Sequence, residues 1–186
     1  MRSSDAVIAS RLPARALLVA AIAVLTAGAC LPGSPAPGDG DAPAFSSIGP
    51  TSTVLVVRVV DGDTIQIEAD GERHTVRYIG IDAPELARDG QPAEPLAAEA
   101  TEANADLVAG RRVVLERDRS ELDRFGRLLR YVWLADGGGW RLINEELVRA
   151  GLAEARSYAP DTARQNRLDG AESSARDAGR GLWAAP

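Results

Sequence analysis

Three short clusters of acidic and arginine residues occur in order along this chain, and together they could act on a phosphate ester. They are Asp61-Gly62-Asp63-Thr64, then Arg77 followed by Asp82-Ala83-Pro84-Glu85, then Asp123-Arg124-Phe125-Gly126-Arg127. Carboxylate and carbonyl oxygens are the ligands that Ca²⁺ prefers, and a carboxylate can also accept a proton from water. Arginine binds phosphate through two parallel hydrogen bonds. The residue types therefore indicate metal-assisted hydrolysis of a phosphodiester.

Each cluster also has an ordinary structural interpretation. Asp-Gly-Asp-Thr is a common turn, Asp-Ala-Pro-Glu is common where a strand ends, and Gly126 is typical of a turn. Arg77 on its own is typical of a solvated strand residue. The residues and their spacing alone therefore leave both interpretations open.

Composition excludes several other kinds of site. All 21 basic residues are arginine, so a P-loop lysine and a Schiff-base lysine are excluded. The chain has one histidine, His74, which rules out a zinc site that needs two. Its one cysteine, Cys30, cannot form an internal disulfide.

The elements that must position these clusters begin with three sequential strands. Val54 to Val60 is rich in β-branched residues, and Thr64 to Glu68 alternates with period two. Asp70-Gly71 predicts a hairpin turn before a third strand from Arg73 to Ile81. The same alternation is expected to place Asp61 and Asp63 on one side of the chain.

A helix, two strands and two further helices are predicted after the meander. Pro95 opens a helical pattern that ends at Gly110, with one apolar face made of Leu96, Ala100, Ala103 and Leu107. The later elements are strands over 112–117 and 128–134, a Gly137-Gly138-Gly139 turn, a helix over 143–150 and a last helix capped by Asp161 and running to Ala178. Five strands with a helix between the third and fourth predict a mostly β, α+β fold: a five-stranded OB barrel with three helices, over residues 53–184.

The N-terminal region is typical of an export signal. Three arginines precede an apolar run from Ala16 to Ala29, which is too short to span a bilayer comfortably. Ala27-Gly28-Ala29-Cys30 resembles a bacterial lipobox, although Ala27 stands where leucine is usual. Residues 1–29 are therefore expected to be a signal peptide and 30–52 a Pro/Gly-rich linker. Lipidation at Cys30 would give a cell-envelope lipoprotein, and plain cleavage after Ala29 a secreted protein.

Taken together, the three clusters resemble the staphylococcal-nuclease (thermonuclease) domain. The resemblance covers roughly Val54 to Trp183 and includes Glu99-Ala100, the segment 144–153 and Trp183 itself. It implies an OB barrel and a calcium-dependent nuclease. Such an enzyme would cut DNA and RNA with little sequence preference, leave 3′-phosphates and act as a monomer.

The resemblance also implies a role for each site residue. Asp63, Asp82 and the main-chain carbonyl of Ala83 would bind Ca²⁺, and Asp61 would act on the ion through water. Glu85 would activate the attacking water, and Arg77 and Arg127 would clamp the phosphate. Arg124 and Tyr158 would contact substrate.

Some positions depart from the family pattern, and two other functions remain open. Ala83 replaces a threonine, Arg124 and Phe125 replace a lysine and a tyrosine, and Tyr158 is one of two familiar tyrosines. The alternatives are a non-catalytic OB-fold module that binds nucleic acid and an envelope lipoprotein that binds another ligand. Intact Glu85, Arg77 and Arg127 argue against the non-catalytic module, because binding alone needs no water-activating carboxylate.

The charge distribution is unusual for a protein that acts on a polyanion. The chain carries −6 overall, and residues 61–110 hold 12 acids against 3 arginines. Residues 111–130 hold 7 arginines against 4 acids. Substrate is therefore expected to be held by the metal, the two clamp arginines and the segment 111–130, with a shallow dependence on salt.

Overall fold

The computed structural model describes residues 53–185. The expected signal peptide, the linker and Cys30 lie outside the described residues. Within the described part, none of the helices has the length and apolar character needed to cross a membrane.

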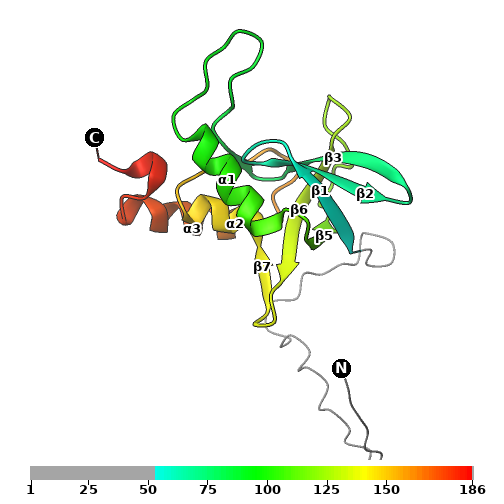
Figure 1. Cartoon of the computed structure of the whole chain (residues 1–186). Coiled ribbons are helices and arrows are strands. Elements are labelled where there is room, and N and C mark those ends of the chain that lie inside the picture. The colour runs from blue at the N-terminus through cyan, green and yellow to red at the C-terminus, as the bar shows by residue number, and fades with distance from the viewer. Residues whose placement is uncertain (1–52, 186) are drawn as a thin grey trace, which may run out of the picture. The chain divides into compact units, whose positions relative to one another are not determined.

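A closed barrel of five strands forms the larger part of the fold (Figure 1). The strands are β1 (Val54–Val59), β2 (Thr64–Ala69), β3 (Glu72–Tyr78), β5 (Arg112–Glu116) and β6 (Leu128–Ala135). β1 pairs with β2 on one side and β5 on the other, and β6 pairs antiparallel with β5 and parallel with β3. The β3–β6 pairing closes the barrel. The predicted five-stranded OB fold is therefore confirmed.

Local sequence explains the β2–β3 hairpin. Asp70 and Gly71 both have positive φ, 53° and 80°, as a two-residue turn of this kind requires. Every residue of β2 pairs with one of β3, from Thr64 with Arg77 to Ala69 with Glu72. This register places Arg77 directly opposite the start of β2, beside the Asp61–Asp63 turn.

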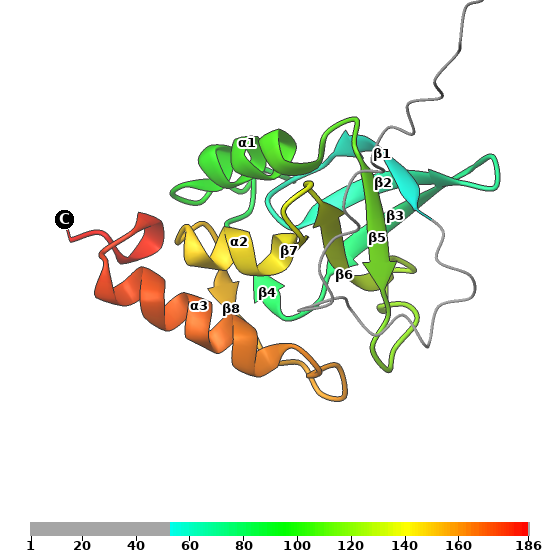
Figure 2. The same ribbon diagram turned by 90° about the horizontal axis from the view of Figure 1, so that it is seen from below.

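Three helices lie together on one side of the barrel, with α2 between α1 and α3 (Figure 2). They are α1 (Ala97–Val108), α2 (Ile143–Arg149) and α3 (Gln165–Asp177), followed by a 3₁₀ turn, Gly181–Trp183. The number of helices and their order match the prediction. The buried face of α1 differs from the predicted one, because it consists of Ala97, Ala100, Asn104 and Val108. A polar residue, Asn104, replaces the expected apolar position, and its amide is fully hydrogen-bonded into the core.

The predicted strand over 73–81 is broken at Gly80. Gly80 has a φ of 78°, and a Cβ there would lie 2.5 Å from Leu168 Cδ1. The chain therefore turns, and Ile81–Asp82 forms a separate strand, β4, that pairs with β8 (Glu154–Ala155). β8 and the short β7 (Trp140–Leu142), which pairs with β6 beyond the glycine turn, were not predicted.

The prediction that Asp161 caps the last helix is wrong. α3 begins at Gln165 and has no side-chain cap. The Asp161 carboxylate instead accepts hydrogen bonds from the main-chain N–H groups of Arg119 (2.8 Å) and Ser120 (2.7 Å). Asp161 thus joins the turn before α3 to the loop after β5, which is a tertiary contact that local sequence does not reveal.

The core is built mostly of Val, Leu, Ile and Ala, as the composition indicates, but its largest side chains are aromatic. Trp133, Tyr78 and Tyr131 are all almost fully buried. Each has a polar partner: Trp133 Nε1 donates to Glu116 (2.7 Å), Tyr78 donates to Asn104 (2.9 Å), and the Tyr131 hydroxyl accepts from the Arg164 N–H (3.2 Å). Burial raises the pKa of the Tyr78 hydroxyl far above its usual value, so this group remains a donor.

Candidate active site

The first acidic cluster forms a buried turn between β1 and β2. Asp61 and Asp63 lie in a bend, so strand alternation does not apply to them, and their carboxylates have different partners. The bend is closed by Val60 N–H donating to the Thr64 carbonyl (2.9 Å) and Asp63 N–H donating to Asp61 Oδ1 (3.2 Å). Both aspartates are buried. A buried carboxylate needs a compensating charge, so a positively charged group is expected next to this turn.

Close packing holds this turn in place from the α1 side. A Cβ at Gly62 would lie 2.6 Å from the Cβ of Ala83 and 2.9 Å from that of Ala100. Asn104 adds a polar link, because its Nδ2 donates to the Asp61 carbonyl (2.9 Å) while its Oδ1 accepts from Tyr78. Sequence reasoning missed Asn104. The available signal was a polar residue on the apolar face of a helix.

Arg77 connects the first two clusters. It projects from β3, is 14% exposed, and forms ion pairs with Asp63 and with Asp82 (2.8 Å). The same guanidinium donates to the Ile81 carbonyl (3.3 Å). The second oxygen of Asp63 accepts from the Ala83 N–H (2.8 Å). Asp63 and Asp82, which were predicted from two separate motifs, therefore pair with one cationic group, and Ala83 is linked to it through Asp63.

This donor set fits a hard divalent cation. The Asp63 and Asp82 carboxylates pair with the two terminal nitrogens of the same guanidinium, so one positive charge already lies between them. Hard cations take such oxygens together with carbonyls and water. Within residues 53–185, no group of three or more His, Cys, Asp and Glu side chains is arranged to hold a metal. An ion here would thus depend on two carboxylates plus main-chain and water oxygens.

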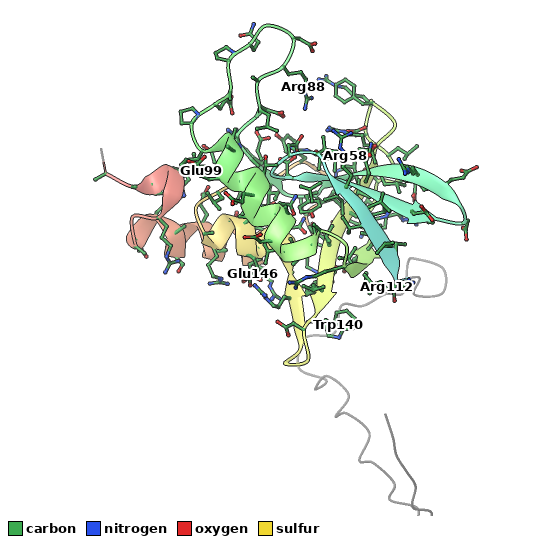
Figure 3. All side chains as sticks on the ribbon, in the orientation of Figure 1. Arg58, Arg88, Glu99, Arg112, Trp140 and Glu146 are labelled. Carbon is green, nitrogen blue, oxygen red and sulfur yellow. The ribbon has the colours of Figure 1, made fainter. Side chains whose placement is uncertain are left out.

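Glu85 lies on a loop that joins β4 to α1. Its side chain is 55% exposed, and the loop is closed at its base by Glu85 N–H donating to Glu94 Oε2 (3.0 Å) and Glu94 N–H donating to the Glu85 carbonyl (2.9 Å). Arg88, labelled on this loop in Figure 3, extends one guanidinium nitrogen to within 3.5 Å of Asp61 Oδ2 and 3.7 Å of Glu85 Oε2. Glu94 and Arg88 were not predicted as site residues.

The third cluster is a tight turn that holds Arg127. Asp123 Oδ1 accepts the N–H groups of Phe125 and Arg127 (both 2.9 Å), and Oδ2 accepts Arg127 Nε (2.6 Å). Partial burial acts to raise the pKa of Asp123, but these hydrogen bonds outweigh it and hold the pKa below its usual value. Phe125 is exposed, with the Arg124 and Arg127 guanidinium carbons 4.6 and 5.5 Å from its ring centre.

A pocket of about 400 Å³ lies between this turn, the end of β3 and the turn before α3. Its lining includes the predicted substrate residues Arg77, Arg124, Arg127 and Tyr158. Tyr158 is exposed, and the turn that carries it is closed by Asp161 N–H donating to the Tyr158 carbonyl (2.9 Å). Asp82 and Glu85 line neighbouring hollows instead. Arg77 is therefore the residue that links the pocket to the carboxylates.

The arginine-rich segment 111–130 is divided in the structure. Glu121 pairs with both Arg117 (2.6 Å) and Arg130, and the hydrogen bond from Arg117 helps to lower the pKa of Glu121. Arg112 lies at the opposite end of the barrel from the Arg88 loop (Figure 3). Within this segment, the arginines that line the pocket are Arg124 and Arg127. Of the segment that was expected to hold substrate, the structure therefore places these two arginines at the pocket.

Asp123→Asn tests the placement of Arg127. Asparagine can still accept the two main-chain N–H groups through its one carbonyl oxygen, but its amide nitrogen cannot accept from Arg127 Nε. We expect kcat/KM on the phosphodiester substrate indicated by the sequence to fall about tenfold, as for a lost charged hydrogen bond, with little change in thermal stability. Steady-state kinetics and thermal unfolding measure the two effects. Asp123→Ala should lose both activity and stability. An Asp123→Asn protein with full activity would show that Asp123 is not needed to orient Arg127.

Comparison with known proteins gives a consistent match. The family model for staphylococcal nuclease homologues matches residues 75–185. The thermonuclease of Staphylococcus hyicus is 38% identical over 131 residues, which is 70% of this chain and 75% of that protein. The thermonuclease of Staphylococcus intermedius is 36% identical over 146 residues, 78% of this chain and 84% of that protein. Endonuclease YncB of Bacillus subtilis is 37% identical over 111 residues, 59% of this chain and 51% of that protein.

The family model spans most of β3, the barrel strands β5 and β6, the three helices, and the second and third clusters, which the structure gathers around Arg77 and the pocket. The chain therefore belongs to the staphylococcal nuclease family and is a nuclease.

Proposed function

We propose that this nuclease is calcium-dependent, hydrolyses phosphodiester bonds of DNA and RNA with little sequence preference, and leaves 3′-phosphates. The observation that carries the proposal is the position of Arg77. It contacts both candidate metal ligands, Asp63 and Asp82, and also lines the pocket that contains Arg127. A phosphate at the pocket edge would thus lie near both the metal ligands and the two arginines.

Asp63, Asp82 and the Ala83 carbonyl are the groups that would hold Ca²⁺, with Asp61 acting through a water molecule. When bound, the ion supplies charge neutralisation at a phosphate oxygen and helps to orient the substrate. The packing of Gly62 against Ala83 and Ala100 keeps the aspartate turn close to β4. The two carboxylates come from different parts of the chain and are held by tertiary contacts.

Glu85 is the group that would accept a proton from the attacking water. Its carboxylate is exposed enough for water to reach, and its backbone is held by Glu94. Arg77 and Arg127 would bind the phosphate oxygens and stabilise the charge that builds at phosphorus. Both guanidiniums are already oriented by aspartates, which lowers the cost of ordering them on binding.

Arg124 and Tyr158 would hold the rest of the nucleotide. Both line the pocket together with the exposed ring of Phe125. Aromatic surfaces stack on any base, and arginine binds any phosphate. Recognition of this kind supports low sequence preference and activity on both DNA and RNA.

Removal of one metal ligand tests the cation site. Asp63→Ala and Asp82→Ala should each weaken Ca²⁺ binding, because each removes an anionic oxygen from a site that has few. We expect a loss of about tenfold or more, measured by calorimetry, with Asp136→Ala as an exposed control. A DNA zymogram of the wild-type protein, run once with calcium and once with EDTA, measures how far nuclease activity depends on the ion. Unchanged Ca²⁺ binding in both variants would remove the proposed site.

The proposal for location rests on the N-terminal sequence. Residues 1–29 act as a signal peptide, residues 30–52 as a linker and Cys30 as the lipidation site, so that the nuclease domain is exported as a monomer and anchored at a membrane surface. Detergent partitioning and mass spectrometry of the mature protein from its host test this. An unmodified, detergent-independent protein that starts at Cys30 would show secretion without an anchor.

A further inference from the structure

Two arginines each pair with two of the four carboxylates of the candidate site. Arg77 bridges Asp63 and Asp82, and Arg88 bridges Asp61 and Glu85. The two bridges differ in burial, since the Arg77 side chain is 14% exposed and that of Arg88 57%. Arg77 has a role in the proposed mechanism. Arg88 has none, although one of its nitrogens lies within ion-pair distance of the proposed base.

The loop places Arg88 with defined geometry. Arg88 N–H donates to the Gln91 carbonyl (3.2 Å), and Gln91 N–H donates back to the Arg88 carbonyl (2.8 Å). Asp89 and Gly90, between them, have φ values of 50° and 81°, as a tight hairpin turn requires. The Glu85–Glu94 hydrogen bonds close the other end of the loop. Arg88 is therefore held on a short hairpin three residues from Glu85.

We propose that Arg88 is a positioning residue that holds the Glu85 carboxylate beside Asp61 and, by its positive charge, weakens the binding of the divalent cation. This inference rests on the proposed function. It assigns a residue outside the three sequence clusters to the same site. It also predicts that removing Arg88 has two opposite effects: kcat falls, whereas binding of the divalent cation becomes tighter.

The first effect concerns the base. Asp61 and Glu85 are both anionic and share one guanidinium nitrogen, so without it they repel each other. Asp61 is buried in its turn, and its carboxylate accepts a hydrogen bond from the Asp63 N–H, so it has less freedom to move than Glu85. Glu85 is half exposed, so its carboxylate would rotate into solvent. The proposed base would then be in its proton-accepting place for a smaller fraction of the time, and kcat would fall.

The second effect concerns the cation. Removing the Arg88 charge leaves the carboxylate cluster one unit more negative at a short distance from the metal ligands. A divalent ion then binds more tightly, by about five- to tenfold if the added interaction acts across about 7 Å of water-like medium. A residue with a purely structural role would weaken both cation binding and turnover. The opposite signs therefore separate the two explanations.

The test compares Arg88→Gln with Arg176→Gln in the full chain. Arg176 lies on α3, is 52% exposed and pairs with Glu172 at 3.4 Å, so it is similar to Arg88 in exposure and is also ion-paired, but it is outside the site. Calcium isotherms are measured without nucleic acid, and kcat on DNA at saturating calcium. We expect Arg88→Gln to bind calcium about five- to tenfold more tightly and to turn over about tenfold more slowly. Arg176→Gln should match wild type in both, and Arg88→Lys should restore wild-type calcium affinity because it restores the charge.

Each other result decides against one proposal. If wild type binds calcium and Arg88→Gln binds it equally or more weakly, the inference fails and the proposed function stands. If Arg88→Gln has wild-type kcat, Arg88 does not position Glu85. If Arg176→Gln shows the same gain in affinity, the effect is one of net charge alone. If wild type binds no calcium and cuts DNA in EDTA, the calcium-dependent function itself is wrong, and the inference fails with it.

Discussion

Replacing Glu85 with glutamine is expected to lower kcat on DNA by about 100-fold or more while the protein remains folded. A positioned general base contributes about 10²–10⁴-fold to rate, and an amide of the same shape cannot accept a proton from water. The Glu85 side chain is half exposed and its backbone bonds do not involve its carboxylate, so the fold should tolerate the change. Steady-state kinetics with saturating calcium measure the loss.

The matched control for this change is Glu102→Gln. Glu102 is an exposed residue of α1, away from the three clusters, and its substitution removes the same charge. It should leave kcat unchanged. DNA binding by Glu85→Gln should persist, because the metal ligands and arginines are intact. Turnover of Glu85→Gln within a few fold of wild type would show that another group activates the water.

The second large effect is expected for Arg77→Lys. Arg77 contacts Asp63, Asp82 and the Ile81 carbonyl at once, and a single ammonium cannot reproduce that planar set of donors. Loss of one preorganised donor at a developing charge costs about 10²–10³ in kcat. We expect a loss of at least that size, together with lower stability, because Asp63 is buried and would be left poorly paired.

Arg127→Lys and Arg176→Lys separate the causes of this loss. Arg127 lines the pocket and contacts only one carboxylate, Asp123, so its lysine variant should lose activity with less change in stability. Arg176→Lys, on α3, should retain full activity. Thermal unfolding reports stability, and single-turnover kinetics report the chemical step. Near-full activity in both Arg77→Lys and Arg127→Lys would mean that the arginines act only through their charge.

The five barrel strands, the three helices and all three clusters could be predicted because the signals are local. The Asp70-Gly71 turn, the alternation in β2 and the glycines that end α1 and α2 depend on residues that are neighbours in the sequence. The turn around Asp123 is also local, since its hydrogen bonds span at most four residues. The order of the clusters was enough to indicate the family.

Tertiary contacts decided how those clusters meet. The break at Gly80 depends on Leu168 and on β8, and it directs Asp82 toward Arg77. Gly80 and Leu168, and likewise the paired residues of β4 and β8, lie more than seventy positions apart along the chain. No local sequence pattern encodes contacts over that distance.

Other contacts of the same kind fix the rest of the site. Asn104 reaches Asp61 across 43 residues, and Asp161 reaches Arg119 across 42, so neither role is visible in a helix or turn pattern. The sequence by itself determined which groups are available for chemistry, because residue type sets charge and hydrogen-bonding capacity. Only the folded structure determined that Arg77 and Arg88 each bridge two carboxylates, because that pairing depends on distances between strands and loops.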